Sequence, residues 1–491
     1  MNTKKFFKNL SILISTGLII KSLSMANRVL VTRFLGLEIL VKYALFTPTM
    51  LLFLSLADFS LPTSLQKFIA KESIKPDANI KGILKNAFTI MINVCLILSI
   101  ILLITANFIT MYLLFEPLLF KPLIFVIPLM FFVSFSGILK GLLQGLEYVN
   151  VTGFNNLMEA ILKIIINFII IFYFKTNIYQ TILYIVIGLN IEEFLSCLFL
   201  IYKVKRLKII PKYEKREPVS PLFKMTSIIT LNRLIYTLSN FLEPIIYTYA
   251  LMQIKIPQAI IQEEYALITS YAIGLLLTSS FISHAISMAL LPILSKHNQN
   301  KEDLHKILSK ALFICFIPSI IISLIFFFHG GDYLKLIYDI NRGGNYVKIL
   351  AFPFMLAYFE GLFYIVLHSI NKTKTTFFIN LCVTLTKISL LFITTKNPYI
   401  GVYGLCISSI VGNILSFALS YLSVRKEIHY QIKLKSFILT IILIFVIGLY
   451  FNFLKNFSIH FIMQDFLASI LYLAIILIYY KKYYAYDIHA E

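Results

Sequence analysis

The chain has 491 residues, of which 59% are hydrophobic and 14% are charged, and its mean hydropathy is +0.85. A soluble domain is about 45–50% apolar and about 25% charged, so this composition excludes an ordinary soluble protein and predicts an all-α polytopic membrane protein. Lys and Arg number 44 against 23 Asp and Glu. Because no long polar segment could form a soluble basic face, we interpret this excess as a signal of membrane orientation and expect no nucleic-acid partner.

Apolar windows of about 20 residues, the length that crosses a bilayer, recur along the whole chain. They predict fourteen transmembrane helices, with a basic amino-terminal segment that resembles a secretion signal but continues as a retained first span. The predicted spans are 10–32, 40–60, 86–112, 122–144, 151–173, 180–202, 223–250, 263–292, 309–328, 347–369, 375–395, 400–423, 436–454 and 463–480.

Basic residues gather in alternate loops between these spans. The segment KVKRLKIIPKYEKREP at 203–218 is the richest, and basic loops follow at 293–308 and 425–435. Lys and Arg in short loops collect on the cytoplasmic side of a membrane. We therefore expect both termini in the cytoplasm, and the loop HGGDYLKLIYDINRGGNY at 329–346 on the opposite side.

Sequence patterns of common enzyme sites are missing. The chain has no GxxxxGK[ST] phosphate loop, no HExxH metal motif, no GxGxxG after a strand and no GxSxG elbow. We therefore expect a protein that is not an enzyme, with no catalytic residues, no metal and no cofactor. A carrier, a channel and an integral-membrane transferase stay open.

The chain repeats itself weakly at an offset of 224 residues, and many carriers are built from two related halves. The repeat predicts two parallel six-helix lobes, 1–205 and 223–425, joined by a basic cytoplasmic linker, 206–222, and followed by two extra helices and a cytoplasmic tail, 426–491. Matched pairs include Thr152 with Thr376, Phe154 with Phe378, Asn156 with Asn380, Lys163 with Lys387, Gly188 with Gly412, and Ser196 with Ser420.

The span 151–173 carries Glu159 and Lys163 one helical turn apart. An ionisable residue near the middle of a bilayer costs about 2.5–3.5 kcal/mol, so it usually faces a partner or a wet cavity. Two readings stay open: the pair neutralises itself and locks the helix in the bundle, or Lys163 faces a cavity. Its repeat counterpart, Lys387, has Val383 and not an acid one turn earlier.

Other spans carry cations and acids of the same kind. Lys21 and Arg28 are seven residues apart and so share a helix face, with Asn27 beside them, and Arg233 lies in the seventh span. Snorkelling toward an interface is the alternative role for Lys21 and Arg28. The acids of the spans have either a structural role or a role in binding a coupling ion; they are Asp58, Glu192, Glu193, Glu243 and Glu360.

Several longer motifs resemble one transporter family. The chain is similar to the oligosaccharidyl-lipid flippase branch of the multidrug, oligosaccharidyl-lipid and polysaccharide exporter superfamily, within it most to the group of stage V sporulation protein B and the lipid II flippases. The resemblance covers about the first 425 residues. It is carried by NRVLVTRFLG at 27–36, LPTSLQKFIAKE at 61–72, LLQGLEYVNVTGFNNLMEAILK at 142–163, ISMALLPILSK at 286–296, and the stretch 370–413.

The resemblance implies export of a polyprenyl-diphosphate-linked sugar, such as lipid II or a polysaccharide repeat unit, across a bacterial-type cytoplasmic membrane through a cationic cavity between the lobes. Arg offers phosphate a planar fork and Lys a compact charge. The predicted cavity cations are Arg28, Lys163, Arg233 and Lys387, and possible cavity or coupling residues are Lys21, Asn27, Asp58, Glu159, Glu243 and Glu360.

Three alternatives to the flippase stay open. An ion-coupled multidrug antiporter of the same superfamily would share the two-lobe plan but would need an acid that captures cationic drugs. An integral-membrane polysaccharide polymerase or ligase would be expected to hold catalytic groups on a large outward loop, for which 329–346 is the longest candidate. The sequence is also compatible with a structural assembly factor.

Overall fold

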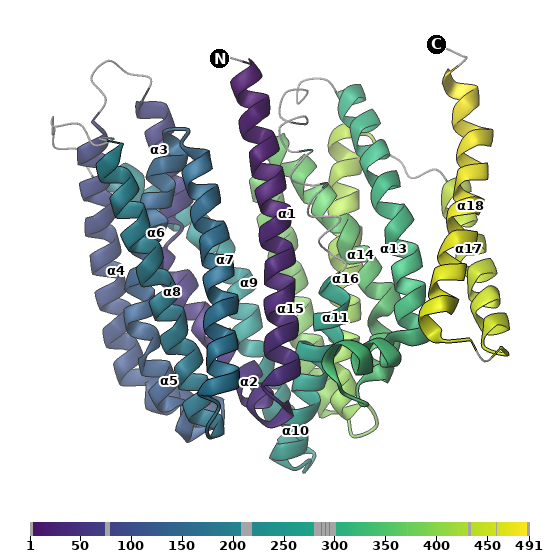
Figure 1. The fold of residues 1–491 in the computed structure, drawn as a ribbon, viewed down its shortest axis with the longest axis horizontal. Coiled ribbons are helices and arrows are strands. Elements are labelled where there is room, and N and C mark those ends of the chain that lie inside the picture. Colours follow the sequence, from purple (N-terminus) through teal and green to yellow (C-terminus); the bar gives the residue numbers. More distant parts are fainter. Residues whose placement is uncertain are drawn as a thin grey trace. The chain divides into compact units, whose positions relative to one another are not determined.

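The computed structural model describes residues 3–73, 79–207, 219–278, 286, 290, 294, 301–370, 372–430, 434–457 and 459–488. These residues form helices joined by short links, and no β-strand occurs among them (Figure 1). The prediction of an all-α polytopic protein is therefore confirmed.

Contacts within the chain group it into two compact units. Unit 1 comprises Met1–Ala266 and Leu391–Val402, and unit 2 comprises Leu267–Leu390 and Tyr403–Glu491. Unit 1 contains α1 (Thr3–Phe34), α2 (Leu37–Asp58), α3 (Leu61–Glu72), α4 (Ile80–Phe108), η1 (Ile109–Leu113), η2 (Pro117–Leu119), α5 (Phe120–Ile124), α6 (Val126–Gly145), α7 (Val149–Tyr173), α8 (Ile178–Arg206), α9 (Ser220–Gln253) and α10 (Gln258–Ala266).

Unit 2 begins where α10 changes into a π-helical segment, η3 (Leu267–Ala272). Its further elements are α11 (Ile273–Thr278), α13 (Lys301–Tyr338), α14 (Gly344–Ser369), η4 (Gly401–Tyr403), α16 (Gly404–Ile428), α17 (Leu434–Leu454) and α18 (Phe461–Ile488). The helix α15 (Thr373–Lys396) lies mostly in unit 2, but its last residues are grouped with unit 1. Helices α17 and α18 form a hairpin that packs against α13 (Figure 1).

The grouping differs from the expected lobes in one respect. Helices α9 and α10 follow the predicted linker 206–222, yet they belong to unit 1 because both pack against α2. The predicted lobes 1–205 and 223–425 rest on sequence repetition and stay a prediction.

Helix lengths match the expected spans. By length and composition, ten helical segments among the described residues are long and apolar enough to cross a membrane. Two shorter apolar stretches, Ile442–Leu454 and Phe461–Ile476, lie on α17 and α18. The other two predicted spans coincide with α1 and α9, and the predicted span 263–292 is described as far as residue 278 and again only at residues 286 and 290. The count of fourteen spans stays a prediction.

Close helix packing in unit 1 depends on a row of glycines on α6. Gly137, Gly141 and Gly145 are spaced four residues apart and face α3. A Cβ atom on Gly141 would lie only 2.6 Å from the carbonyl oxygen of Pro62, so any side chain there would push the helices apart. In a bilayer, where water does not drive helices together, such close approach is a main source of association. This row therefore fixes α3 on α6.

Two local predictions need correction. The predicted span 40–60 extends two residues past its helix, because α2 ends at Asp58, where Phe59 and Ser60 adopt positive φ angles of 45° and 48° and separate α2 from α3. The predicted loop 329–346 is mostly helix: α13 continues to Tyr338, and only residues 339–343 link it to α14. Gly330 and Gly331 lie within α13 and permit its close packing on α14.

Candidate functional site

The predicted cations of the first helix lie on its exposed side. Lys21 and Arg28 are both exposed, and neither forms an ion pair with any residue that the structure describes. Asn27 instead accepts a hydrogen bond of 2.8 Å from Asn167 of α7, and α1 packs along α7 (Figure 1). Asn27 therefore contributes to the packing of α1 on α7.

Glu159 does not pair with Lys163. Its Oε1 lies 2.7 Å from Nζ of Lys140 on α6, and it accepts a 2.7 Å hydrogen bond from Asn155 and a further one from Ser196 of α8. Lys163 is half-buried and makes no ion pair with a described residue, although the Glu192 carboxylate acts on it electrostatically. The reading in which Glu159 and Lys163 neutralise each other is therefore wrong, because Glu159 is already used to join three helices.

Glu192 and Glu193 lie near the Lys140–Glu159 pair. Glu192 is buried, and Glu193 accepts a 2.9 Å hydrogen bond from Ser136 of α6. We use the name α6–α8 charge cluster for Lys140, Glu159, Lys163, Glu192 and Glu193. With three carboxylates and two ammonium groups, this partly buried cluster holds one more acidic than basic group.

Asp58 and Arg233, predicted as an acid and a cation of separate spans, form an ion pair between the end of α2 and α9. The Asp58 side chain is 12% exposed and that of Arg233 is 49% exposed. A Cβ atom on Gly137 of α6 would lie 3.2 Å from Oδ1 of Asp58, so this glycine leaves room for the carboxylate. Arg233 therefore presents an accessible guanidinium that is partly neutralised.

The remaining predicted acids have nearby hydroxyl groups. Glu243 of α9 is buried and accepts a long hydrogen bond of 3.4 Å from Tyr265 of α10. In unit 2, Glu360 of α14 accepts a hydrogen bond from Ser416 of α16. These contacts favour a structural role for both acids in the described conformation.

Lys387 belongs to unit 2, and its alkyl stem packs against Gly412 of α16, where a Cβ would meet its Cγ at 3.7 Å. Sequence repetition had matched Lys387 with Lys163 and Gly412 with Gly188. Each unit also contains a serine–carboxylate hydrogen bond between two of its helices. In unit 1 the serine is on α6 and the acid on α8, whereas in unit 2 the acid is on α14 and the serine on α16.

One polar network escaped the sequence analysis. Glu116, which follows the π-helical segment η1, forms an ion pair with Lys42 of α2 and accepts hydrogen bonds of 2.7 Å from Tyr179 of α8 and 2.8 Å from Gln262 of α10. The Glu116 side chain is only 8% exposed. We call these four residues the Glu116 network. Its members are separated by up to 220 positions in sequence, so no local sequence pattern predicts the network.

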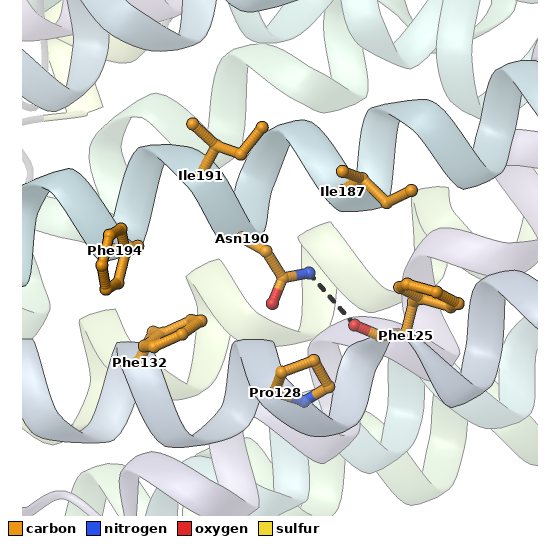
Figure 2. A pocket seen from close by; sticks show the side chains of 7 residues that line it. All are labelled: Phe125, Pro128, Phe132, Ile187, Asn190, Ile191 and Phe194. Carbon is orange, nitrogen blue, oxygen red and sulfur yellow. Dashed lines mark hydrogen bonds between the residues drawn. The ribbon is translucent and has the colours of Figure 1, made fainter.

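A separate apolar pocket of about 300 Å³ lies between α6 and α8. Figure 2 shows aromatic and aliphatic side chains around a single amide, Asn190, which donates a 3.1 Å hydrogen bond to the carbonyl of Phe125 at the break between α5 and α6. The pocket has no cationic lining residue, so it does not suit a diphosphate. Its lining is Phe125, Pro128, Phe132, Ile187, Asn190, Ile191 and Phe194.

The sequence is similar to a known protein family and to a known bacterial protein. The protein family described as polysaccharide biosynthesis protein matches residues 6–298. Stage V sporulation protein B of Bacillus subtilis (strain 168) is 25% identical over 474 residues, which cover 93% of this chain and 90% of that protein.

Solved structures of two transporters have a similar fold. The lipid II flippase MurJ in an inward closed conformation has a TM-score of 0.69 at 16% identity, covering 96% of this chain and 99% of that chain. An inward-facing multidrug resistance MATE family transporter of the MOP superfamily has a TM-score of 0.64 at 14% identity, covering 86% and 98%. At these identities the two structures show a shared fold and nothing finer. Because the family match spans more than half of the 491 residues, the chain belongs to the polysaccharide biosynthesis protein family.

Proposed function

We propose that this protein is a flippase that moves a polyprenyl-diphosphate-linked sugar, such as lipid II or a polysaccharide repeat unit, from the inner to the outer leaflet of a bacterial cytoplasmic membrane. Both termini lie in the cytoplasm. The head group crosses by alternating access through a cationic cavity between the two predicted lobes, while the polyprenyl tail stays in lipid.

The observation that carries this proposal is the absence of described ion-pair partners for three cations of unit 1. Lys21 and Arg28 are exposed on α1, and Lys163 makes no ion pair with a described residue, because Glu159 is bound to Lys140 and Glu192 acts on Lys163 only electrostatically. Charges inside a membrane protein are costly, and those without a fixed counter-ion usually serve a ligand or a water-filled cavity. Phosphate oxygens are acceptors of the strength and geometry that Arg and Lys favour.

Arg233 acts at a second stage of the same path. Its ion pair with Asp58 is half exposed, so a diphosphate that approaches α9 replaces the carboxylate as the partner of the guanidinium. Exchange of one anion for another costs less than desolvating an unpaired cation. Lys387 is the fourth of the predicted cavity cations, after Arg28, Lys163 and Arg233.

Transport takes its energy from an ion gradient or from the membrane potential. Moving one elementary charge through 100 mV is worth about 2.3 kcal/mol, which is enough to bias the return of the empty cationic cavity. The α6–α8 charge cluster is the place where we expect a coupling proton to bind, because its carboxylates outnumber its ammonium groups.

A multidrug antiporter is the second candidate, and the buried carboxylates of the same cluster favour it, since a cationic drug needs an acidic partner. A polymerase or ligase has less support, because the link at 339–343 is too short to carry a set of catalytic groups.

The test uses the purified chain in proteoliposomes. Lipid II, another polyprenyl-diphosphate sugar and a cationic dye are offered separately, and the accessible fraction of each is followed with time. We expect a diphosphate lipid to cross at a rate above that of protein-free vesicles and the dye to stay. Dye transport without lipid transport would overturn the flippase in favour of the antiporter.

A further inference from the structure

A buried histidine–aspartate pair joins the C-terminal hairpin to α13 within unit 2. Nδ1 of His329 lies 2.7 Å from Oδ1 of Asp465 on α18, and each side chain is only 6% exposed. Neither residue belongs to the cationic or acidic positions described above. The pair is therefore independent of the proposed head-group path.

The backbone of α13 is shaped around His329. This residue has non-helical φ and ψ angles of −122° and 17° inside the helix, and it precedes two glycines. A Cβ atom on Gly330 would lie 2.5 Å from Cγ1 of Val347 on α14, so the kink is packed tightly against that helix. A histidine held at a fixed kink cannot easily move away from its partner.

Aromatic rings surround the pair. The imidazole of His329 lies 5.7 Å from the ring of Phe451 and 5.9 Å from that of Phe461, and Phe451 is fully buried. Tyr333, one turn further along α13, interacts with the same Asp465 carboxylate. Water is thus largely excluded, and charges that are not compensated here carry a large desolvation cost.

Charged groups of the neighbouring helices do not neutralise Asp465. Lys348 of α14 lies over the ring of Phe327, and Lys455, just after α17, lies over the ring of Phe328; in the part of unit 2 that the structure describes, neither forms an ion pair with Asp465. The other titratable groups around the pair are Tyr333 on α13 and Tyr472 on α18.

The Asp465 carboxylate has few polar neighbours. Besides the His329 imidazole, the Tyr333 hydroxyl interacts with it, and its buried Oδ2 has no hydrogen bond of ordinary geometry to a described residue. A neutral imidazole beside an ionised Asp465 would leave a net negative charge in this apolar position. Two arrangements of the pair are electrically neutral: an imidazolium with a carboxylate, and an imidazole with a carboxylic acid. Each holds one proton more than a neutral imidazole beside a carboxylate.

We propose that His329 and Asp465 form a binding site for one exchangeable proton and that this proton holds the α17–α18 hairpin against α13. Histidine is the side chain whose ordinary titration falls between about pH 5 and pH 8. Proton binding and docking of α18 are linked reciprocally: loss of the proton loosens the hairpin, and a loosened hairpin releases the proton.

The test measures hydrogen exchange of the segment 461–476 in the full chain, held in lipid nanodiscs at about pH 5 and about pH 8 and corrected for the intrinsic effect of pH. In the unmodified protein we expect exchange of this segment to be several-fold faster at the higher pH. Equal protection at both pH values would overturn the proposal. This measurement uses the unmodified protein and so does not depend on the folding of a variant.

Two variants give opposite signatures. In His329→Gln only Asp465 is left to hold the proton, and a carboxyl group is ordinarily ionised at both pH values, so the segment should exchange fast at both. In Asp465→Asn the charge that requires a proton is gone, so the segment should stay protected at both. A pH difference that survives in both variants would overturn the proposal.

Matched controls come from the same hairpin and the same helix. His460 is exposed beside Phe461, and Asp332 is exposed on α13. His460→Gln and Asp332→Asn should each keep the pH difference of the unmodified protein. Loss of that difference in His460→Gln would assign the effect to the surface histidine and overturn the proposal for His329.

Discussion

Glu159 of α7 forms its ion pair with Lys140 of α6 and not with Lys163, which lies one helical turn further along the same helix. Glu159 and Lys163 are neighbours in the sequence but differ in role. Glu159 is used in helix packing, whereas we propose that Lys163 binds the head group. Glu159 is bound to two neighbouring helices, whereas Lys163 keeps a positive charge that no ion pair among the described residues neutralises.

The first prediction follows from that division. Lys140→Gln or Glu159→Gln leaves one buried charge behind, and we expect the free energy of unfolding to fall by about 3–5 kcal/mol. Lys163→Gln should change it by less than about 1 kcal/mol. Thermal unfolding in detergent measures both effects. The double variant Lys140→Gln, Glu159→Gln is the control and should recover most of the stability; equal losses for all single variants would contradict the assignment.

The second prediction concerns the Asp58–Arg233 pair. Asp58→Asn removes the competing anion, so we expect a diphosphate lipid to bind about tenfold more tightly, which corresponds to about 1.4 kcal/mol. Arg233→Gln should weaken binding instead. Binding to the purified protein is measured by titration with the labelled lipid. Lys224→Gln changes an exposed cation on the same helix and should have no effect; weaker binding in Asp58→Asn would show that the acid does not compete.

The third prediction concerns the Glu116 network. Because Glu116 is buried and its charge is compensated by Lys42, we expect Lys42→Met to lower the free energy of unfolding by about 3–5 kcal/mol. The double variant Lys42→Met, Glu116→Gln should be closer to the unmodified protein, as thermal unfolding would reveal. Glu38→Gln alters an exposed acid on the same helix and serves as the control. A double variant that is less stable than Lys42→Met would refute the pairing.

The fourth prediction concerns the orientation of the chain in the membrane. In a Cys382→Ala background, which removes an exposed native thiol, Lys205→Cys should resist a membrane-impermeant thiol reagent in intact cells. Asn341→Cys, in the short link after α13, should react. Both positions are exposed in the structure. Labelling of Lys205→Cys from outside would reverse the proposed topology.

Helices and most of their positions were predictable because hydropathy alone identifies segments of about 20 apolar residues. The boundaries that failed depend on single backbone angles. Nothing in the sequence LADFSLPT indicates that α2 ends at Asp58 and that Phe59 and Ser60 separate it from α3. Glycines at 330 and 331 are equally compatible with a loop and with tight helix packing, and only the position of α14 decides between them.

The sequence shows which charged residues lie within predicted spans, but it does not show which residues they pair with. Helical spacing suggested Lys163 as the partner of Glu159, because sequence shows only neighbours on the same helix. The partner found, Lys140, lies on a different helix, and the two partners Lys42 and Gln262 of the Glu116 network are 220 positions apart. Such contacts depend on how helices pack together, which periodicity does not specify.

The central claim is that cations of unit 1 bind the anionic head group of a lipid-linked sugar, and Arg28 tests it most directly. The measurement is the initial rate at which the head group of a diphosphate-linked sugar becomes accessible outside proteoliposomes that contain Arg28→Gln. Loss of charge-assisted hydrogen bonds worth about 1.5–3 kcal/mol predicts a rate about ten to a hundred times lower. Arg33→Gln, an exposed arginine near the end of the same helix, should leave the rate unchanged. An Arg28→Gln protein that inserts normally and transports at the full rate would contradict the account.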